Sequence, residues 1–327
     1  MHRMTSRAAG LLLGHAADRL LGDPRRFHPV AGFGGVAAAL ERRLYADRRA
    51  HGVAHVAVLV GGTVAAAVAA ERAVRRPLPH MLLTAAATWA VLGGRSLERE
   101  ATAVHALLSA GDLPGARQRL RHLVGRDTTR LSPDETARAV IESVAENTSD
   151  AVVASYAWAA VAGVPGLLGH RAANTLDAMI GHHNDRYERF GWAAARFDDL
   201  LGLPGSRLSG LLTVACGPDP RAALGAWRRD AGDHPSPNAG VVEASFAGAL
   251  GVRLGGTNTY YGNRQEHRAL MGDGRPPAPA DIPPTVRLAR RVGVGAALIA
   301  AAVSLLRVRP AMPGGRVLRR SQNVQLR

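Results

Sequence analysis

The sequence predicts an all-α fold, a polytopic integral membrane protein whose helical spans are joined by polar helical connecting segments. Three observations predict it: stretches without charged residues that are long enough to cross a bilayer, arginines at the ends of those stretches, and weak strand signals throughout the 327 residues. A transmembrane helix needs ~20 mostly apolar residues, with a range of about 17–25. The mean hydropathy of −0.03 is low for a membrane protein. Buried helices of a soluble all-α protein are therefore the alternative.

The stretches without Asp, Glu or Arg fall at 53–70, 77–94, 151–169 and 292–306. The first three reach the length of a span and the fourth is slightly short. The third, 151–169, is the most convincing because it is the longest. Shorter apolar runs lie at 27–40, 208–216 and 244–252, and these are short enough to be half-buried or re-entrant.

The charge pattern narrows the possible functions. Arg and Lys total 41 against 26 acidic residues, and every one of these cations is Arg, because the sequence contains no lysine. A P-loop, a kinase-type lysine and a Schiff-base lysine are therefore excluded. Arginines flank the apolar runs, as positive-inside topology predicts, and no nucleic-acid-binding module is present. A coding bias towards Arg and Ala explains the composition equally well.

The single Cys216 excludes an intrachain disulfide and any multi-cysteine metal site.

The polar segments complete the order of elements. Residues 98–150 read as a polar helical insertion, with a capping box at Ser132–Glu135 that starts a helix. Residues 276–284 form a proline-rich linker before the last apolar run. We expect residues 1–306 to form one polytopic domain and residues 307–327 to be a disordered tail.

Three carboxylates recur every four residues on the helix that Ser132 opens: Glu142, Glu146 and Asp150. This spacing places them on one helix face, directly before the longest apolar run. Clustered carboxylates with a neighbouring amide, here Asn147, are hard oxygen ligands suited to Mg²⁺. A solvated acidic face is the equally weighted alternative.

Further polar clusters follow the 151–169 run. Asn174 and Asp177 share a helix face, and the segment 184–186 (Asn-Asp-Arg) comes after them. A rigid turn, His234-Pro-Ser-Pro-Asn238, precedes a later apolar stretch, and Arg126 lies in a separate polar segment where it is able to meet a phosphate.

Seven short motifs, in order, resemble the CobD/CbiB family of cobalamin-biosynthesis proteins. They are Gly22-Asp-Pro with His28-Pro-Val, Gly125-Arg-Asp-Thr, Glu142-Ser-Val-Ala-Glu-Asn-Thr148, Asn174-Thr-Leu-Asp177, Gly191-Trp-Ala with Asp198-Asp199, His234-Pro-Ser-Pro-Asn238 and Gly248-Ala-Leu-Gly-Val-Arg-Leu-Gly-Gly256. The resemblance runs from about residue 20 to 262. The sequence departs from the family pattern at His183, Ala31 and Ser155.

The resemblance implies a multi-pass protein of the inner (cytoplasmic) membrane. The implied reaction is an ATP-dependent amide ligation that joins adenosylcobyric acid to aminopropanol or aminopropanol phosphate, giving adenosylcobinamide or its phosphate. Implied partners are the corrinoid and amino-alcohol substrates, membrane lipid and other late cobalamin-pathway enzymes, and no nucleic acid. ATP is the co-substrate and Mg²⁺ the cofactor.

Clustering and resemblance together give the expected site. Expected catalytic residues are His234, as the general base, and Glu146. Expected metal ligands are Glu142, Glu146, Asp150, Asp177 and Asp185. Expected substrate- and phosphate-binding residues are Arg126, Asp127, Asn147, Asn174, Asn184, Arg186, Ser236 and Asn238.

A transporter, or a membrane-bound sensory protein without ligase activity, is the alternative function. Transporters place ionisable groups within their spans. The charged motifs here are expected on connecting segments instead, which favours surface chemistry over a translocation path.

Overall fold

The chain is described by a computed structural model that covers residues 3–24, 28–182, 184–260 and 264–306. Within these ranges the fold is almost entirely helical, which confirms the predicted all-α class. The α-helices are α1 (Arg3–Leu21), α2 (Pro29–Leu44), α3 (Arg49–Ala73), α4 (Pro77–Leu92), α5 (Gly94–Ser109), α6 (Leu113–Leu120), α7 (Pro133–Asn147), α8 (Ala154–Ile180), α9 (Trp192–Cys216), α10 (Pro220–Asp230), α11 (Ala239–Leu250) and α12 (Ile282–Leu306).

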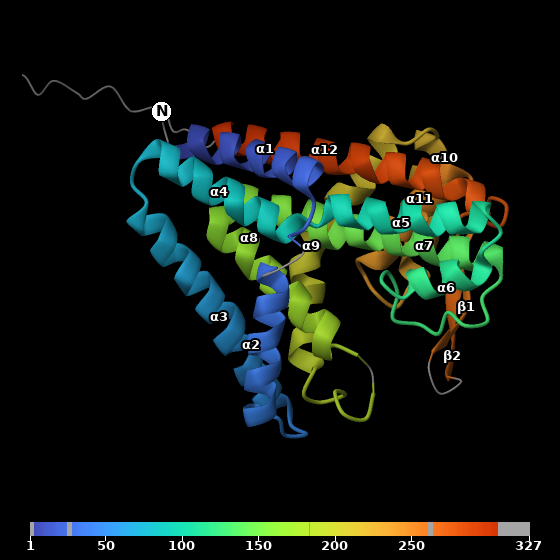
Figure 1. The fold of residues 1–327 in the computed structure, drawn as a ribbon, viewed down its shortest axis with the longest axis horizontal. Coiled ribbons are helices and arrows are strands. Elements are labelled where there is room, and N and C mark those ends of the chain that lie inside the picture. Colours follow the sequence, from blue (N-terminus) through green and yellow to red (C-terminus); the bar gives the residue numbers. More distant parts are fainter. Residues whose placement is uncertain (1–2, 25–27, 183, 261–263, 307–327) are drawn as a thin grey trace, which may run out of the picture.

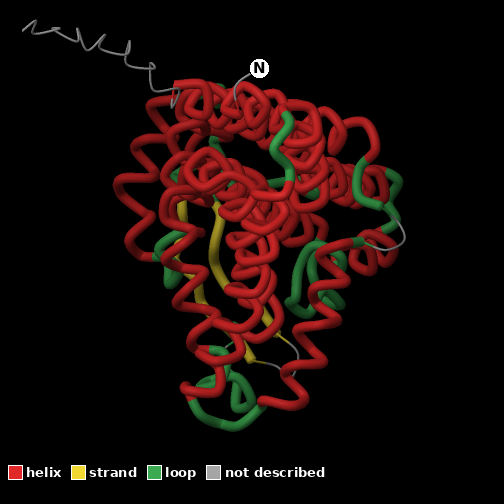
Figure 2. Tube along the Cα trace, turned by 90° about the vertical axis from the view of Figure 1, so that its left-hand side faces the viewer, coloured by secondary structure: helices red, strands yellow, loops and turns green. Residues whose placement is uncertain are grey.

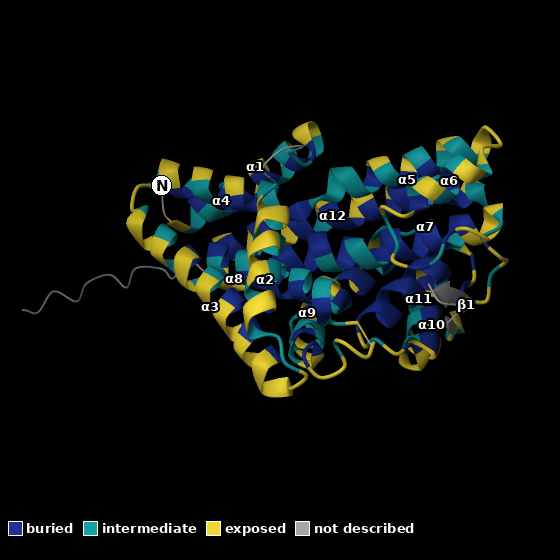
Figure 3. Cartoon of the chain, turned by 60° about the horizontal axis from the view of Figure 1, so that its bottom comes forward, coloured by how far each residue is buried: buried dark blue, intermediate teal, exposed yellow. Residues whose placement is uncertain are grey.

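The helices form a layered body with an extension on one side. Helices α1, α4, α5 and α12 lie along one side of the molecule, over α7 and α8 (Figure 1). Helix α2, the N-terminal part of α3 and the α8–α9 connection extend from the opposite side, as the side view in Figure 2 also shows. Burial follows this arrangement, because α7 and α11 are mostly buried whereas α2 and α3 are largely exposed (Figure 3).

Three of the described helical segments are long and apolar enough to cross a membrane: Arg49–Ala73, Pro133–Ile180 and Pro279–Leu306. They contain three of the four uncharged stretches that the sequence singles out. The fourth, 77–94, corresponds to α4, which is only 16 residues long. The membrane character predicted from the sequence is therefore supported by the structure.

The segment Pro133–Ile180 is not one straight helix. Gly163 has φ 69° and ψ −149°, and Pro165 follows it. A Cβ at Gly166 would press against the carbonyl oxygen of Trp158, eight residues earlier, although eight residues of straight helix rise about 12 Å. The chain therefore reverses here, and the expectation of one continuous span over 151–169 is wrong.

The reversal is stabilised by a side chain from another helix. Glu71, near the end of α3, accepts a hydrogen bond from the backbone nitrogen of Val164 through its Oε1 at 3.1 Å. This nitrogen is one that the break leaves without a helical partner. A Cβ at Gly163 would contact Glu71 and Arg7, so both the positive φ and the close packing require glycine.

Six residues between α7 and α8, Thr148–Val153, form a π-helix. A π-helical turn contains more residues than an α-helical turn, so it rotates α8 relative to α7. The expected stripe of Glu142, Glu146 and Asp150 is thus divided: the two glutamates belong to α7 and Asp150 to the π-helix. Such segments recur at functional sites.

A β-hairpin of β1 (Leu254–Tyr260) and β2 (Arg264–Met271) was not expected from the sequence. It is antiparallel, and its register shifts between Leu254 and Gly256. Gly255 and Gly256 adopt positive φ angles of 85° and 94°, which explains why glycines begin the first strand. Arg138 of α7 donates hydrogen bonds to the carbonyl oxygens of Gly255 and Thr257 and so ties the hairpin to the helical body.

Two smaller expectations have mixed outcomes. The capping box at Ser132 and Glu135 is confirmed, with both reciprocal hydrogen bonds present. The linker expected over 276–284 is wrong in its second half, because Pro279–Asp281 is a 3₁₀ turn that leads directly into α12. Arg275 pairs with Asp281 at 2.7 Å and stabilises this start. The expected tail, 307–327, and His183 lie outside the described residues.

Asp18 of α1 predicts how stability depends on pH. Its side chain is 2% exposed, and its Oδ2 accepts a hydrogen bond from the backbone nitrogen of Arg95 at 3.1 Å. Burial raises the pKa of the Asp18 carboxyl to about 6. The folded protein therefore holds this proton up to a higher pH than the unfolded chain does, and the carboxyl destabilises the fold as pH rises from about 4 through 6.

We expect Asp18→Asn to remove the loss of stability that the buried Asp18 carboxyl causes as pH rises. In thermal unfolding in detergent, the variant should melt a few degrees above the wild type at pH 8, and the difference should shrink towards pH 4. A variant that melts below the wild type at pH 8 would contradict the prediction. The amide retains the acceptor for Arg95, so loss of that hydrogen bond is not a complication.

Candidate functional site

Carboxylates from five elements form a continuous row through the interior of the described molecule. Glu243 of α11 and Glu142 of α7 lie at one end, and Asp177 of α8 and Asp198 of α9 lie at the other. Glu146 and Asp150 are between them, since the charge of Glu146 acts both on Glu243 and on Asp150. Arginines accompany both ends. We call this set of six carboxylates the acidic row.

At the first end, both carboxylate oxygens of Glu142 accept hydrogen bonds from within the protein. Its Oε2 accepts a hydrogen bond from Nη2 of Arg126 at 2.6 Å, and its Oε1 accepts one from the backbone nitrogen of Gly255 at 3.0 Å. Arg138 lies 3.8 Å away. The side chains of Arg126 and Glu142 are only 7% and 5% exposed. Two residues expected as a phosphate clamp and a metal ligand therefore pair with each other, and the solvated-face alternative for Glu142 is wrong.

Glu243 is buried beside Glu142 without a hydrogen-bond partner. Its side chain is 0% exposed, and neither carboxylate oxygen accepts a hydrogen bond from the described residues. The nearest cationic atoms are Nε2 of His234 at 3.8 Å and Nη1 of Arg268 at 4.0 Å. Burial, together with the charges of Glu142 and Glu146, raises the pKa of the Glu243 carboxyl.

The orientation of His234 follows from its own turn. The backbone N–H of Ser236 donates to Nδ1 of His234 at 3.0 Å. Nδ1 also lies 3.2 Å from the carbonyl oxygen of Ser236, so the backbone of this residue orients the ring and Nε2 faces Glu243. The predicted general base is thus one half of a buried His–Glu pair.

Glu146 connects the two ends of the row. The charges of Arg268, Glu142 and Arg126 act on it, and it acts in turn on Asp150 in the π-helix. Both ends of the row thus share this one carboxylate, and its expected catalytic and metal-binding roles stay predictions.

At the second end, the charges of Asp177 and Asp198 act on Asp150, and Arg171 lies close enough to Asp150 and Asp198 for their charges to act on it. In a straight helix Asp150 and Asp177 would be about 40 Å apart. The reversal at Gly163 is what brings them close enough for each charge to act on the other. Burial, and then the charge of Asp177, raises the pKa of the Asp198 carboxyl to about 7.

Asn174 belongs to this second end. Its Oδ1 accepts a hydrogen bond from Nη1 of Arg171 at 3.2 Å, and its side chain also hydrogen-bonds to Asp198. The amide thus orients a buried cation and a carboxylate at the same time. Its expected place in the site is consistent with this geometry.

Three other expected polar residues are engaged within the protein. Asn147 donates from Nδ2 to the carbonyl oxygen of Ser143 at 2.9 Å. The hydroxyl of Ser236 accepts hydrogen bonds from the backbone nitrogens at the start of α11. Asn238 donates to the carbonyl oxygen of Asp199 at 2.8 Å and accepts from Ser206 at 2.9 Å. Asn147 thus bonds within its own helix, whereas Ser236 and Asn238 fix the start of α11, and Asn238 ties it to α9.

The remaining expected residues lie in turns away from the row. Asp127 accepts hydrogen bonds from the backbone and hydroxyl of Thr129. Asn184 accepts from the backbone nitrogens of Arg186 and Tyr187, and Asp185 is exposed in the same turn.

Arg186, in that turn, pairs with Glu41 at 2.9 Å, and its guanidinium carbon lies 4.2 Å from the Tyr45 ring centroid. Arg186 itself pairs with Glu41, but its neighbours Tyr187 and Glu188 line a cavity together with Asp199 and Pro235.

Sequence reasoning missed five members of the site: Arg138, Arg171, Asp198, Glu243 and Arg268. Asp198 appeared only within a motif of the resemblance. A signal existed for Glu243, which is the one charged residue in the apolar helix Ala239–Leu250. An isolated ionisable residue in an apolar helix is itself a functional indication. No such signal exists for the three arginines, because arginines are frequent along the whole chain.

Comparisons with known proteins show which proteins this chain resembles. A family model described as CobD/Cbib protein matches residues 11–289. The chain is similar to the cobalamin biosynthesis protein CobD of Mycobacterium tuberculosis, with 50% identity over 299 residues, covering 90% of this chain and 95% of the relative. The proteins of the same name from Rhodobacter capsulatus and Chromobacterium violaceum are 42% and 44% identical, covering 91% and 88% of this chain and 98% and 94% of those relatives. No solved structure matches.

Proposed function

We propose, from the premise that this chain belongs to the CobD/CbiB family and acts in cobalamin biosynthesis, that it is an ATP-dependent amide ligase. The reaction joins adenosylcobyric acid to aminopropanol or aminopropanol phosphate and gives adenosylcobinamide or its phosphate. The observation that carries the proposal is the acidic row, with an arginine-containing cluster at each end. A multi-pass protein of the inner membrane fits the apolar helices. The proposal requires that substrates reach the acidic row from the cytoplasm, where ATP is.

The chemistry requires two steps. In the first, an oxygen of the corrinoid carboxylate bonds to the terminal phosphorus of ATP, and ADP leaves. In the second, the amine nitrogen bonds to the acyl carbon, phosphate leaves, and one proton on nitrogen passes to a base. Fixed cations stabilise the phosphoryl transfer, and a positioned base assists the second step.

The described residues offer groups for both steps. Arg268 and Arg171, one at each end of the row, are candidates for phosphate contacts, whereas Arg126 is held by Glu142. The His234–Glu243 pair is the candidate proton acceptor, because the carboxylate of Glu243 accepts no hydrogen bond from the described residues.

Mg²⁺ fits the second end of the row better than the first. No three acidic, histidine or cysteine side chains among the described residues are close enough to form a ready-made metal site. Mg²⁺ needs no such cage, since it keeps several waters and is bound by one or two carboxylates together with substrate phosphates. Asp150 and Asp177, with Asp198 beside them, are the residues that would hold it. When bound, it would bridge phosphate oxygens and neutralise their charge.

A direct assay tests the proposal. Purified protein in detergent, given adenosylcobyric acid, aminopropanol phosphate, ATP and Mg²⁺, should form a corrinoid product with the mass of adenosylcobinamide phosphate and one ADP per product. Omitting either reactant should stop ADP formation. A folded protein that consumes no ATP when offered both reactants would overturn the proposal.

One observation favours transport as the second candidate function. The candidate span Pro133–Ile180 contains four carboxylates of the acidic row: Glu142, Glu146, Asp150 and Asp177. These carboxylates lie outside the uncharged stretch 151–169 itself, so the placement of the charged motifs beside the spans stays a prediction. Uptake of a corrinoid into vesicles that contain the protein, without ATP consumption or amide product, would favour the transporter.

A further inference from the structure

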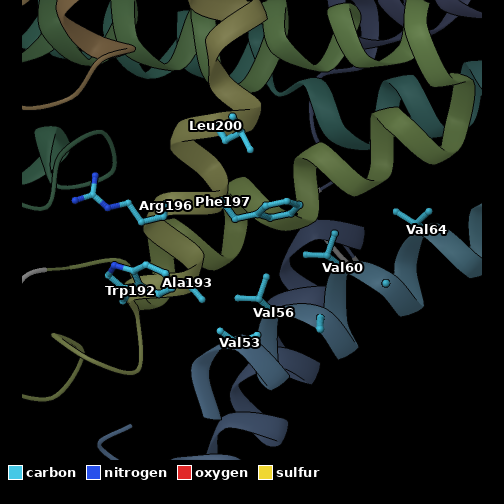
Figure 4. A pocket seen from close by; sticks show the side chains of 11 residues that line it. Val53, Val56, Val60, Val64, Trp192, Ala193, Arg196, Phe197 and Leu200 are labelled. Atoms are coloured by element: carbon cyan, nitrogen blue, oxygen red, sulfur yellow. The ribbon is translucent and has the colours of Figure 1, made fainter. Parts of the chain in front are cut away.

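A groove between α3 and α9 continues into a polar cavity at the start of both helices. The groove has a volume of about 590 Å³ and is lined by valines of α3, among them Val53, Val56 and Val60, and by Phe197 and Leu200 of α9. In Figure 4 the valines of α3 face Ala193 and Phe197, while Arg196 extends away from them. The groove itself offers apolar surface and little else.

The polar cavity shares a wall with the groove. Its volume is about 270 Å³, and it is lined by Arg49, His182 and Tyr187. Trp192 and Arg196 line both spaces, so the groove and the cavity are continuous at these two residues. The combined space is apolar along α3 and polar where α3 begins, with two arginines and two carboxylates in the cavity wall.

The position of α3 sets what surrounds the groove. Helix α3 is a candidate membrane span, and only 28% of its most apolar window is buried within the described molecule. Apolar side chains on a spanning helix that do not contact protein face lipid. Trp192 is 39% exposed at the junction, and tryptophan is enriched where a membrane meets water.

The arginines at the junction are weakly engaged by the protein. The guanidinium carbon of Arg49 lies 4.9 Å from the ring centroid of Trp192. Nη1 of Arg196 is 3.9 Å from Oδ2 of Asp199, and the Arg196 side chain is 70% exposed. Glu188 and Asp199 also line the cavity. Two guanidinium groups are therefore available to an anion at the end of an apolar groove.

We propose that this space binds one anionic phospholipid, with an acyl chain along the valines of α3 and the headgroup phosphate between Arg49 and Arg196. The complementarity of charge at one end and of apolar surface along the rest selects this occupant. A zwitterionic lipid would fill the groove equally well but would gain less from the arginines. The proposal stands independently of the ligase reaction.

Quenching of tryptophan fluorescence by brominated lipids tests it. The full chain is placed in phosphatidylcholine nanodiscs that contain a small, varied fraction of brominated phosphatidylglycerol or brominated phosphatidylcholine. The chain has 4 tryptophans, and subtraction of a Trp192→Phe variant isolates the signal of Trp192. We expect half-maximal quenching of that signal at an at least fivefold lower fraction of phosphatidylglycerol than of phosphatidylcholine.

The matched variants replace two arginines near the start of α3, one of them on α9, or two arginines near its end. Arg49→Gln with Arg196→Gln should remove the preference for phosphatidylglycerol, whereas Arg72→Gln with Arg75→Gln, at the other end, should retain it. All four side chains lie outside the core, so folding is preserved.

Several outcomes overturn the proposal. Equal quenching by both lipids would show ordinary boundary lipid. Quenching by neither would show that a second copy of the chain covers the groove. A preference that survives in the Arg49/Arg196 variant, or is lost in the Arg72/Arg75 variant, would show general attraction to the membrane surface.

Discussion

Replacing Glu146 with Gln should abolish ATP-dependent amide formation while the protein accumulates normally in the membrane. Glu146 is the carboxylate that couples both ends of the acidic row, since the charges of Arg268 and Arg126 act on it and it acts on Asp150. Glutamine keeps the shape and loses the charge. Removal of one preorganised charge from a site of this kind costs on the order of 100- to 1000-fold in turnover.

The control is Asp134→Asn, an exposed carboxylate in the first turn of the same helix. It should retain the wild-type rate. Rates are measured in the assay of the corrinoid product, and melting temperatures in detergent establish that each variant is folded. A Glu146→Gln protein with full turnover would show that this carboxylate is a bystander and would move the reacting groups to one end of the row.

The helical class could be predicted from sequence because it depends on local properties. Uncharged stretches, arginines at their ends and the capping box at Ser132 are all readable along the chain, and α3 appears nearly where the stretch 53–70 predicts it. The reversal at Gly163 could not be predicted in the same way. Glycine and proline are tolerated within transmembrane helices, and what makes this pair a reversal is the contact of distant Glu71 with the freed backbone.

The acidic row was predictable in part, for the same reason. Periodicity identified Glu142, Glu146 and Asp150 and the motif at Asn174 and Asp177, but a helical repeat of four assumes one unbroken α-helix. The π-helix and the reversal decide which carboxylates meet, and both depend on tertiary packing. The β-hairpin was missed because its position depends on hydrogen bonds from Arg138, a residue far away in sequence.

The second large effect concerns the ion pair of Arg126 with Glu142. Both side chains are almost fully buried, so Arg126→Met would leave the charge of Glu142 desolvated and without its closest cation. Breaking a buried pair in this way costs about 3–5 kcal/mol. Glu142 also accepts from the backbone of Gly255, so the damage should extend to the hairpin. We expect a melting temperature in detergent that is lower by roughly 10 °C or more.

Two further variants separate loss of the ion pair from simple loss of an arginine. Arg189→Met removes an exposed arginine that lies 3.8 Å from Asp47, and its effect should be within about 1 kcal/mol because water already screens that pair. The double variant Arg126→Met with Glu142→Gln should regain much of the lost stability, because no unpaired charge remains and the amide oxygen still accepts from Gly255. If the Arg126→Met variant has the same melting temperature as the Arg189→Met variant, Glu142 is not held by Arg126 in solution. Arg126 would then be available again as the phosphate-binding residue that the sequence suggested, and the first end of the acidic row would bind substrate instead of supporting the fold.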